Sequence, residues 1–140
     1  MTIEEKIAHY KESLDFFEDT MDKYKFLLDQ GKKAPTFPEK YRQDNFKVVG
    51  CQSQVWVVPY LENNFLCFYT DSDAFLTKGM ITILSDIYGN NLPKEILKSD
   101  FKLVERLKLD VMLTPGRTNG VHSMLKDIKK YAELFSKENN

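Results

Sequence analysis

Apolar residues recur at alternating spacings of four and three along the first thirty residues. The stripe comprises Ile3, Ile7, Tyr10, Leu14, Phe17, Met21, Tyr24 and Leu28. This spacing is typical of amphipathic helix, and one long coiled-coil helix would satisfy it. Asp19 and Thr20, however, are good N-cap residues in the middle of the stripe. We therefore favour two helices, with a capping box of Thr2 and Glu5 at the start and Gly31 as a stop.

The period changes after a connector, residues 32–46, in which prolines stop any helix. Residues 46–49, 54–60 and 65–70 are rich in β-branched and aromatic side chains, which predicts strands. Between the last two strands, Glu62-Asn63-Asn64 is predicted to be a turn, because Asn tolerates a positive φ. We expect a three-stranded antiparallel meander.

The second half returns to helical spacing. Residues 73–88 predict a helix that Asp71 or Ser72 caps and Gly89 ends. Apolar residues cover most of its girth, so we expect the central buried helix. Gly79 costs about 1 kcal/mol there relative to Ala, which indicates a close packing contact.

Three further helical segments are predicted. They are a short helix over 93–98, a turn or two over 101–107, and a last amphipathic helix over 121–135 that Asn119 caps. Helices on both sides of a strand region indicate a single α+β domain spanning residues 1–140.

Charge and hydropathy exclude several functions. The 140 residues carry 20 basic and 21 acidic side chains, a net charge of −1. This balance argues against a nucleic-acid partner, which requires a basic face. No apolar run approaches the roughly 20 residues that span a bilayer, and the acidic N-terminus does not resemble a secretory signal. We expect no membrane association and a cytoplasmic location.

The chain has two cysteines, Cys51 and Cys67. Two are too few for a disulfide scaffold or a four-cysteine metal site, and the spacing of His9 and His122 does not complete a zinc finger. We therefore expect no metal. Cys51 follows Gly50 between two predicted strands, so it is either an accessible working thiol or a small hydrophobe at a strand end. Cys67 alternates within an apolar strand and is expected to be inert.

Other motifs have simpler structural explanations. A hydrolase would need a histidine beside Cys51, but His9 and His122 fall on predicted helices, where a surface or half-buried position is expected. Residues 71–73 could suggest a cation site, although helix capping explains them better. Residues 116–120 could hold an anion at a helix N-terminus or form an exposed turn.

The heptapeptide Gly50-Cys51-Gln52-Ser53-Gln54-Val55-Trp56 resembles the signature of the SufE family, the sulfur acceptors of bacterial iron–sulfur cluster assembly, which the similar CsdE proteins share. Further segments resemble the family in order and spacing over nearly the whole chain. They are residues 22–31, 71–74, 78–79 and 113–120. In the last segment, Gly116 and Thr118 stand where the family usually has Ser.

This resemblance implies a function. A pyridoxal-phosphate cysteine desulfurase of the SufS or CsdA type would pass persulfide sulfur to Cys51. The transfer would stimulate the desulfurase. Cys51 would then deliver the sulfur to a SufBCD-type scaffold. Pyridoxal phosphate would belong to the partner, so this chain needs no cofactor. The residues implied to support the loop or contact the partner are Gly50, Gln52, Ser53, Gln54, Asp73 and Arg117.

Alternatives remain open. The chain could be an interaction module that activates a desulfurase allosterically with Cys51 dispensable, or a cysteine hydrolase, for which we expect no activity. NifU-type scaffolds share a related fold but use three cysteines, which this chain lacks. For a carrier, we expect Cys51 to be shielded at rest on a mobile loop, residues 50–53, with Arg117, if near, favouring the thiolate.

Overall fold

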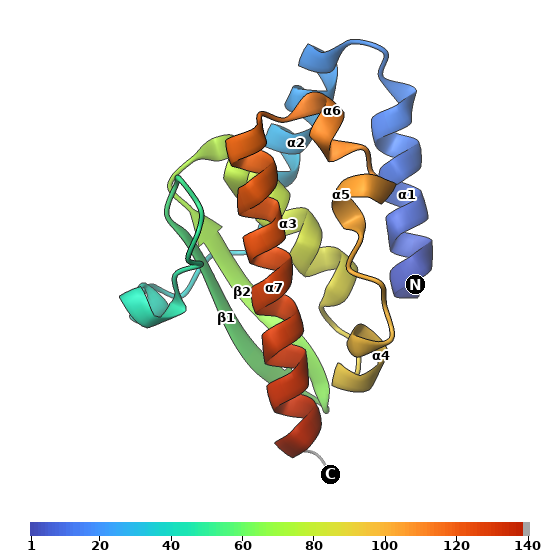
Figure 1. Cartoon of the computed structure of the whole chain (residues 1–140). Helices are drawn as coiled ribbons and strands as arrows, with labels where there is room; N and C mark the ends of the chain where they lie inside the picture. Colours follow the sequence, from blue (N-terminus) through green and yellow to red (C-terminus); the bar gives the residue numbers. More distant parts are fainter. Residues whose placement is uncertain (139–140) are drawn as a thin grey trace.

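The computed structural model describes residues 1–138 and has an α+β architecture (Figure 1). The elements are α1 (Ile3–Phe16), α2 (Thr20–Lys32), the 3₁₀ turns η1 (Glu39–Tyr41) and η2 (Asp44–Phe46), β1 (Val55–Glu62), β2 (Phe65–Ser72), α3 (Phe75–Tyr88), α4 (Pro93–Leu97), α5 (Leu103–Arg106), α6 (Leu109–Met112) and α7 (Pro115–Glu138). The β1–β2 hairpin lies on one side, α1 lies on the other, and α3 runs between them behind α7 (Figure 1). The α+β class is therefore confirmed. None of the helices within residues 1–138 is long and apolar enough to span a membrane.

The N-terminal stripe forms two helices. Thr2 and Glu5 make the expected capping box, and the Asp19 side chain caps α2 by accepting from the Met21 N–H. Gly31 does not end α2, which continues to Lys32. A Cβ at Gly31 would lie 3.0 Å from the Gly79 backbone nitrogen, so the absence of a side chain lets α2 approach α3 closely.

The sheet has two strands, so the prediction of three was wrong. Residues 46–49 contribute one bridge, Lys47 to Trp56, and one bond from the Val48 N–H to the Val55 carbonyl at 2.8 Å. The η2 turn precedes this bridge and Gly50, with φ +102°, bends the chain away after it. The segment therefore runs alongside β1 for too few residues to extend the ladder. The Asn63–Asn64 turn is confirmed, with positive φ at both residues.

Helix α3 is the buried centre that the sequence predicts. Seven of its fourteen residues are buried, including Gly79. A Cβ at Gly79 would collide with the Leu27 carbonyl oxygen of α2, which confirms the expected close contact. The helix begins at Phe75, two residues later than predicted, because Asp71 and Ser72 complete β2.

Helix α7 begins at Pro115, so the prediction of Asn119 as its cap was wrong. The Thr114 hydroxyl accepts from the Arg117 N–H at 3.3 Å, and the Thr114 carbonyl accepts from the Thr118 N–H at 2.9 Å. Thr followed by Pro is a typical helix start. Residues 116–120 therefore form the first turns of α7 rather than an exposed turn.

The connector between α2 and β1 packs on the outer face of the hairpin. The Arg42 guanidinium lies over the Phe37 and Trp56 rings, 4.9 and 4.7 Å from their centroids. Its Nη2 lies 2.7 Å from a carboxylate oxygen of Asp71 at the end of β2. This contact fixes the sheet end that leads into α3.

Substituting Gly79→Ala should destabilise the protein, because the added methyl group forces α2 and α3 apart. The gain in helix propensity of about 1 kcal/mol is smaller than an overpacking cost of about 1–3 kcal/mol. A lower urea midpoint than wild type is expected, whereas the exposed Glu12→Ala in α1 should leave it nearly unchanged. A Gly79→Ala midpoint at or above wild type would show that the helices separate freely.

Candidate functional site

The cysteine loop, residues 49–53, is held at both ends. Before the loop, the Val48 N–H donates a hydrogen bond to the Val55 carbonyl. After it, the Asp73 carboxylate accepts from the Gln54 backbone N–H at 2.9 Å and from its side-chain amide at 3.1 Å. The Asp73 N–H returns a bond to the Gln54 carbonyl at 3.2 Å. Asp73 therefore joins the loop to the start of α3.

Where the chain passes over α7, position 50 accepts only glycine. Gly50 adopts φ +102°, which side chains rarely allow. A Cβ there would also stand 2.5 Å from the Ser123 hydroxyl oxygen. Gly50 thus combines a left-handed turn with a close approach to α7.

Gly116 and Gly120 lie one helical turn apart in α7, and they leave the helix backbone exposed beneath the loop. A Cβ at Gly116 would lie 2.7 Å from the Gln52 amide nitrogen, and one at Gly120 would lie 3.4 Å from the Cys51 sulfur. The Cys51 Sγ lies 3.5 Å from the Gly120 carbonyl oxygen, its single hydrogen-bond contact within residues 1–138. The middle of the loop therefore rests on α7 through packing and one weak bond.

A cavity of about 220 Å³ adjoins the Cys51 thiol. Its remaining lining comes from the loop, the start of α3 and the first turns of α7: Gln52, Ser53, Ala74, Phe75, Leu76, Thr77, Gly116, Arg117, Gly120 and Met124. Neither histidine lines it or bonds to Cys51. Among the described residues, no histidine therefore stands beside Cys51 where the base of a cysteine hydrolase usually lies.

Burial raises the pKa of the Cys51 thiol to about 11, and the Asp127 carboxylate on α7 contributes in the same direction. Arg117 reaches the cavity wall, yet the pKa stays raised, so the expected opposition from its charge is not seen. At neutral pH the resting thiol is protonated and weakly nucleophilic. Cys51 is half-buried, whereas Cys67 is buried, belongs to neither apolar cluster and lines a separate groove.

The structure brings the residues named from the sequence to one place. Gln52, Ser53 and Arg117 line the cavity with Cys51, and Asp73 holds Gln54 at its edge. Sequence reasoning missed the contributions of Gly120, Ser123 and Met124. The spacing of Gly116 and Gly120 was the available signal, but it is informative only once both lie on a helix.

These observations define a small α+β protein with one half-buried cysteine on a loop above a cavity. Residues 8–132 match the SufE family, described as an Fe-S metabolism associated domain. The chain belongs to the SufE family. Within residues 1–138, no three His, Cys, Asp or Glu side chains gather as a metal site.

Individual relatives agree with this assignment. An uncharacterised SufE-like protein of Rhizobium etli is 34% identical over 124 residues, which cover 85% of this chain and 84% of that protein. The cysteine desulfuration protein SufE of Wigglesworthia glossinidia brevipalpis is 36% identical over 120 residues, 84% of this chain and 83% of that protein. A hypothetical protein from Thermus thermophilus, solved in solution, shares the fold with a TM-score of 0.78 at 18% identity, covering 94% of this chain and 96% of its own.

The raised pKa predicts the pH dependence of Cys51 alkylation. At pH 8 about one thousandth of a thiol with a pKa of about 11 is thiolate, against about a quarter of a free cysteine. Because a more basic thiolate is intrinsically more nucleophilic, we expect iodoacetamide to react roughly tenfold or more slowly than with glutathione. The Cys67→Ser variant isolates the reaction of Cys51. Its rate should still rise at pH 10, where glutathione levels off; equal rates at pH 8 would contradict shielding.

Removing the Asp73 anchor should expose Cys51. Asp73→Ala deletes two hydrogen bonds to Gln54, each worth about 1 kcal/mol, so alkylation at pH 8 should accelerate by up to about tenfold in the Cys67→Ser background. Asp110→Ala removes an exposed carboxylate from the first turn of α6 and serves as the control. An unchanged rate in Asp73→Ala would mean that packing against α7 holds the loop alone.

Proposed function

We propose that this protein accepts persulfide sulfur from a pyridoxal-phosphate cysteine desulfurase on Cys51, stimulates that enzyme and delivers the sulfur to an iron–sulfur cluster scaffold. The observation that supports this most directly is the position of Cys51, alone on a loop held at both ends, above a small cavity. Membership of the SufE family and the name of the Wigglesworthia relative, a cysteine desulfuration protein, support the same function.

The transfer requires little from this chain beyond a thiolate. The Cys51 thiol releases its proton to solvent, and the thiolate attacks the terminal sulfur of the desulfurase persulfide. One sulfur–sulfur bond forms as the other breaks, and the desulfurase cysteine leaves as a thiolate that can take up a proton. No electron is gained or lost overall, which fits a site without a neighbouring histidine base.

The resting geometry separates storage from reaction. Half-buried against α7, Cys51 has a pKa of about 11 and resists stray oxidants and thiols. When the loop leaves α7, its sulfur regains water and its pKa falls toward about 8.5. Docking of the desulfurase therefore activates the thiol by exposing it. After transfer, the cavity of about 220 Å³ has room for the additional sulfur atom.

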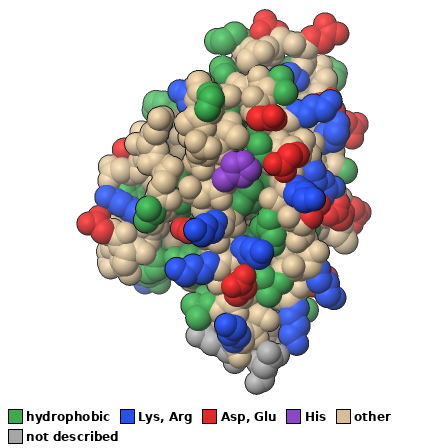
Figure 2. Space-filling model, viewed as in Figure 1, with side chains coloured by type: hydrophobic (Ala, Val, Ile, Leu, Met, Phe, Trp, Pro, Cys, Tyr) green, Lys and Arg blue, Asp and Glu red, His purple; other side chains and the backbone are tan. Residues whose placement is uncertain are grey.

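Exposed apolar side chains surround the loop and offer a docking surface for the desulfurase. Val49 is 88% exposed and Phe75 is 80% exposed, and Asp73 and Arg117 add one charge of each sign. Basic and acidic groups are interspersed over the face that α7 crosses (Figure 2). With no broad field of one sign, recognition depends on local shape and a few placed charges.

Cys51→Ser tests the carrier function. The protein is mixed with a SufS-type desulfurase, pyridoxal phosphate and L-cysteine, and its intact mass is measured. Wild type and Cys67→Ser should gain one sulfur atom, whereas Cys51→Ser should gain none because its hydroxyl cannot hold a persulfide. If Cys51→Ser gains sulfur and Cys67→Ser does not, the acceptor is Cys67, and the proposal is contradicted.

Desulfurase turnover in the same mixtures distinguishes the second candidate, an allosteric activator. A carrier speeds turnover by removing the persulfide, so Cys51→Ser should lose most of the stimulation. Undiminished stimulation by Cys51→Ser would support activation through docking alone.

A further inference from the structure

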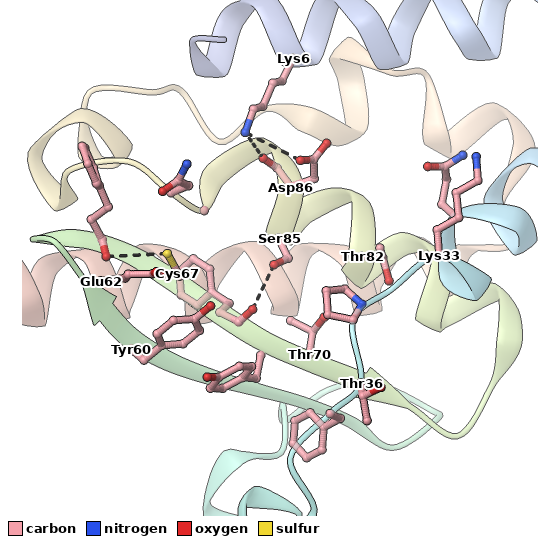
Figure 3. A pocket seen from close by; sticks show the side chains of 18 of the residues that line it. Lys6, Lys33, Thr36, Tyr60, Glu62, Cys67, Thr70, Thr82, Ser85 and Asp86 are labelled. Carbon is pink, nitrogen blue, oxygen red and sulfur yellow. Dashed lines mark hydrogen bonds and ion pairs between the residues drawn. The ribbon is translucent and has the colours of Figure 1, made fainter.

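A second recess follows the edge of β2 that does not pair with β1. Its volume is about 770 Å³, and it shares no lining residue with the cavity beside Cys51. The walls come from α1, the connector after α2, and α3, with β2 along the floor (Figure 3). Lining residues from both faces of β2, such as Cys67 and Phe68, show that the recess wraps around the strand edge.

The hairpin register shows which backbone groups face this recess. The Leu66 N–H donates to the Asn91 carbonyl and its carbonyl accepts from the Asn90 N–H, both at 2.8 Å, so Leu66 points away from β1. In an antiparallel ladder every second residue points the same way, which turns Phe68 and Thr70 outward as well. The Phe68 carbonyl accepts from the Ser85 hydroxyl at 3.3 Å.

The remaining outward groups of Phe68 and Thr70 have no hydrogen-bond partner within residues 1–138. They are the N–H of Phe68 and both the N–H and the carbonyl of Thr70. Proteins usually protect such an edge with proline, charge or a bulge. Residues 68–70 contain no proline or charged side chain, and the register runs without a bulge through eight pairs. This edge can therefore accept another backbone.

The recess selects for a single extended segment. Thr82 and Ser85 of α3 stand on one side of the open edge, and Thr36 of the connector stands near Thr70 on the other (Figure 3). In a second copy of this chain, β2 would lie in its own equivalent recess behind the same walls. The two recessed strand edges therefore cannot reach each other. A flexible peptide has no such obstruction.

Charge indicates the composition of that peptide. Asp86 is already engaged, because it accepts from the Tyr10 hydroxyl at 2.5 Å and lies 3.7 Å from the Lys6 ammonium. Lys33 lines the recess at the same end as Thr36 (Figure 3), and it forms no ion pair with a carboxylate of residues 1–137. Glu62 lies at the far, hairpin end (Figure 3). The open part of the edge therefore favours an acidic residue.

We propose that this recess binds an extended acidic peptide segment of a partner protein, which adds a strand to β2 at Phe68–Thr70. The Phe68 N–H and the N–H and carbonyl of Thr70 supply the pairing, and Lys33 selects a carboxylate. The site is separate from the Cys51 loop and does not depend on sulfur transfer.

A random heptapeptide library displayed on phage tests the proposal against the full-length protein. Enriched peptides are synthesised, and their affinities are compared for wild type and three variants. Thr70→Pro removes the outward N–H without breaking a β1–β2 bond, and Thr70→Val keeps that N–H as its matched control. Lys33→Glu reverses the charge at an exposed position, and equal urea midpoints verify that each variant folds.

The selected peptides should be acidic, and Thr70→Pro should weaken their binding about three- to tenfold relative to Thr70→Val. Lys33→Glu should weaken binding at low salt, with the difference shrinking as salt is raised. Equal affinities for Thr70→Pro and Thr70→Val would overturn strand addition. Enrichment of basic or uncharged peptides, or of none, would overturn the acidic-peptide site. If Thr70→Pro lowers the urea midpoint, protection of the Thr70 amide from hydrogen exchange by the selected peptide decides the question in wild type.

Discussion

Burial of α3 is the constraint on which the other elements depend. Its buried side chains include Met80, Ile81, Ile83, Leu84, Ile87 and Tyr88, each worth roughly 1.5–3 kcal/mol when removed from water if large and apolar. These side chains face several directions, so α1, α2, the hairpin and α7 must all pack around them. Gly79 allows one of those neighbours, α2, to approach until backbones touch. The start of α3 is thereby fixed, and with it Asp73, which holds the cysteine loop.

Helix α7 forms the second surface of the site, because two glycines leave its backbone exposed there. Gly116 and Gly120 leave its backbone bare, and Gln52 and Cys51 occupy the space. Within residues 1–138, Cys51 makes one weak hydrogen bond in this contact, to the Gly120 carbonyl. Strong bonds lie instead at the two loop ends, at Val48 and Gln54. In the proposed function, this distribution lets the middle of the loop leave α7 while its ends remain in place.

The partial burial that shields the Cys51 thiol also keeps it protonated and weakly nucleophilic. A pKa near 11 keeps Cys51 protonated in the cell's pH range, and only exposure restores an ordinary thiolate population. In the proposed function, solvation couples the reactivity of Cys51 to docking, without an acid–base partner beside the thiol. Cys67 differs in its place, since it lies within β2 and not on the loop.

The sequence by itself determined the α+β class, the two N-terminal helices, the Asn63–Asn64 turn and the close contact at Gly79. It also favoured Cys51 over Cys67 as the working thiol, which stays a prediction. These features depend on local periodicity, capping and short motifs, which are readable along the chain. Only the tertiary structure decided that residues 46–49 form a bridge instead of a third strand, because strand pairing depends on how far two distant segments run together. It also decided that Gly31 marks a helix contact, that Gly116 and Gly120 seat the loop, and that the edge of β2 stays open. Each of these properties belongs to a pair of surfaces, and neither surface contains the information alone.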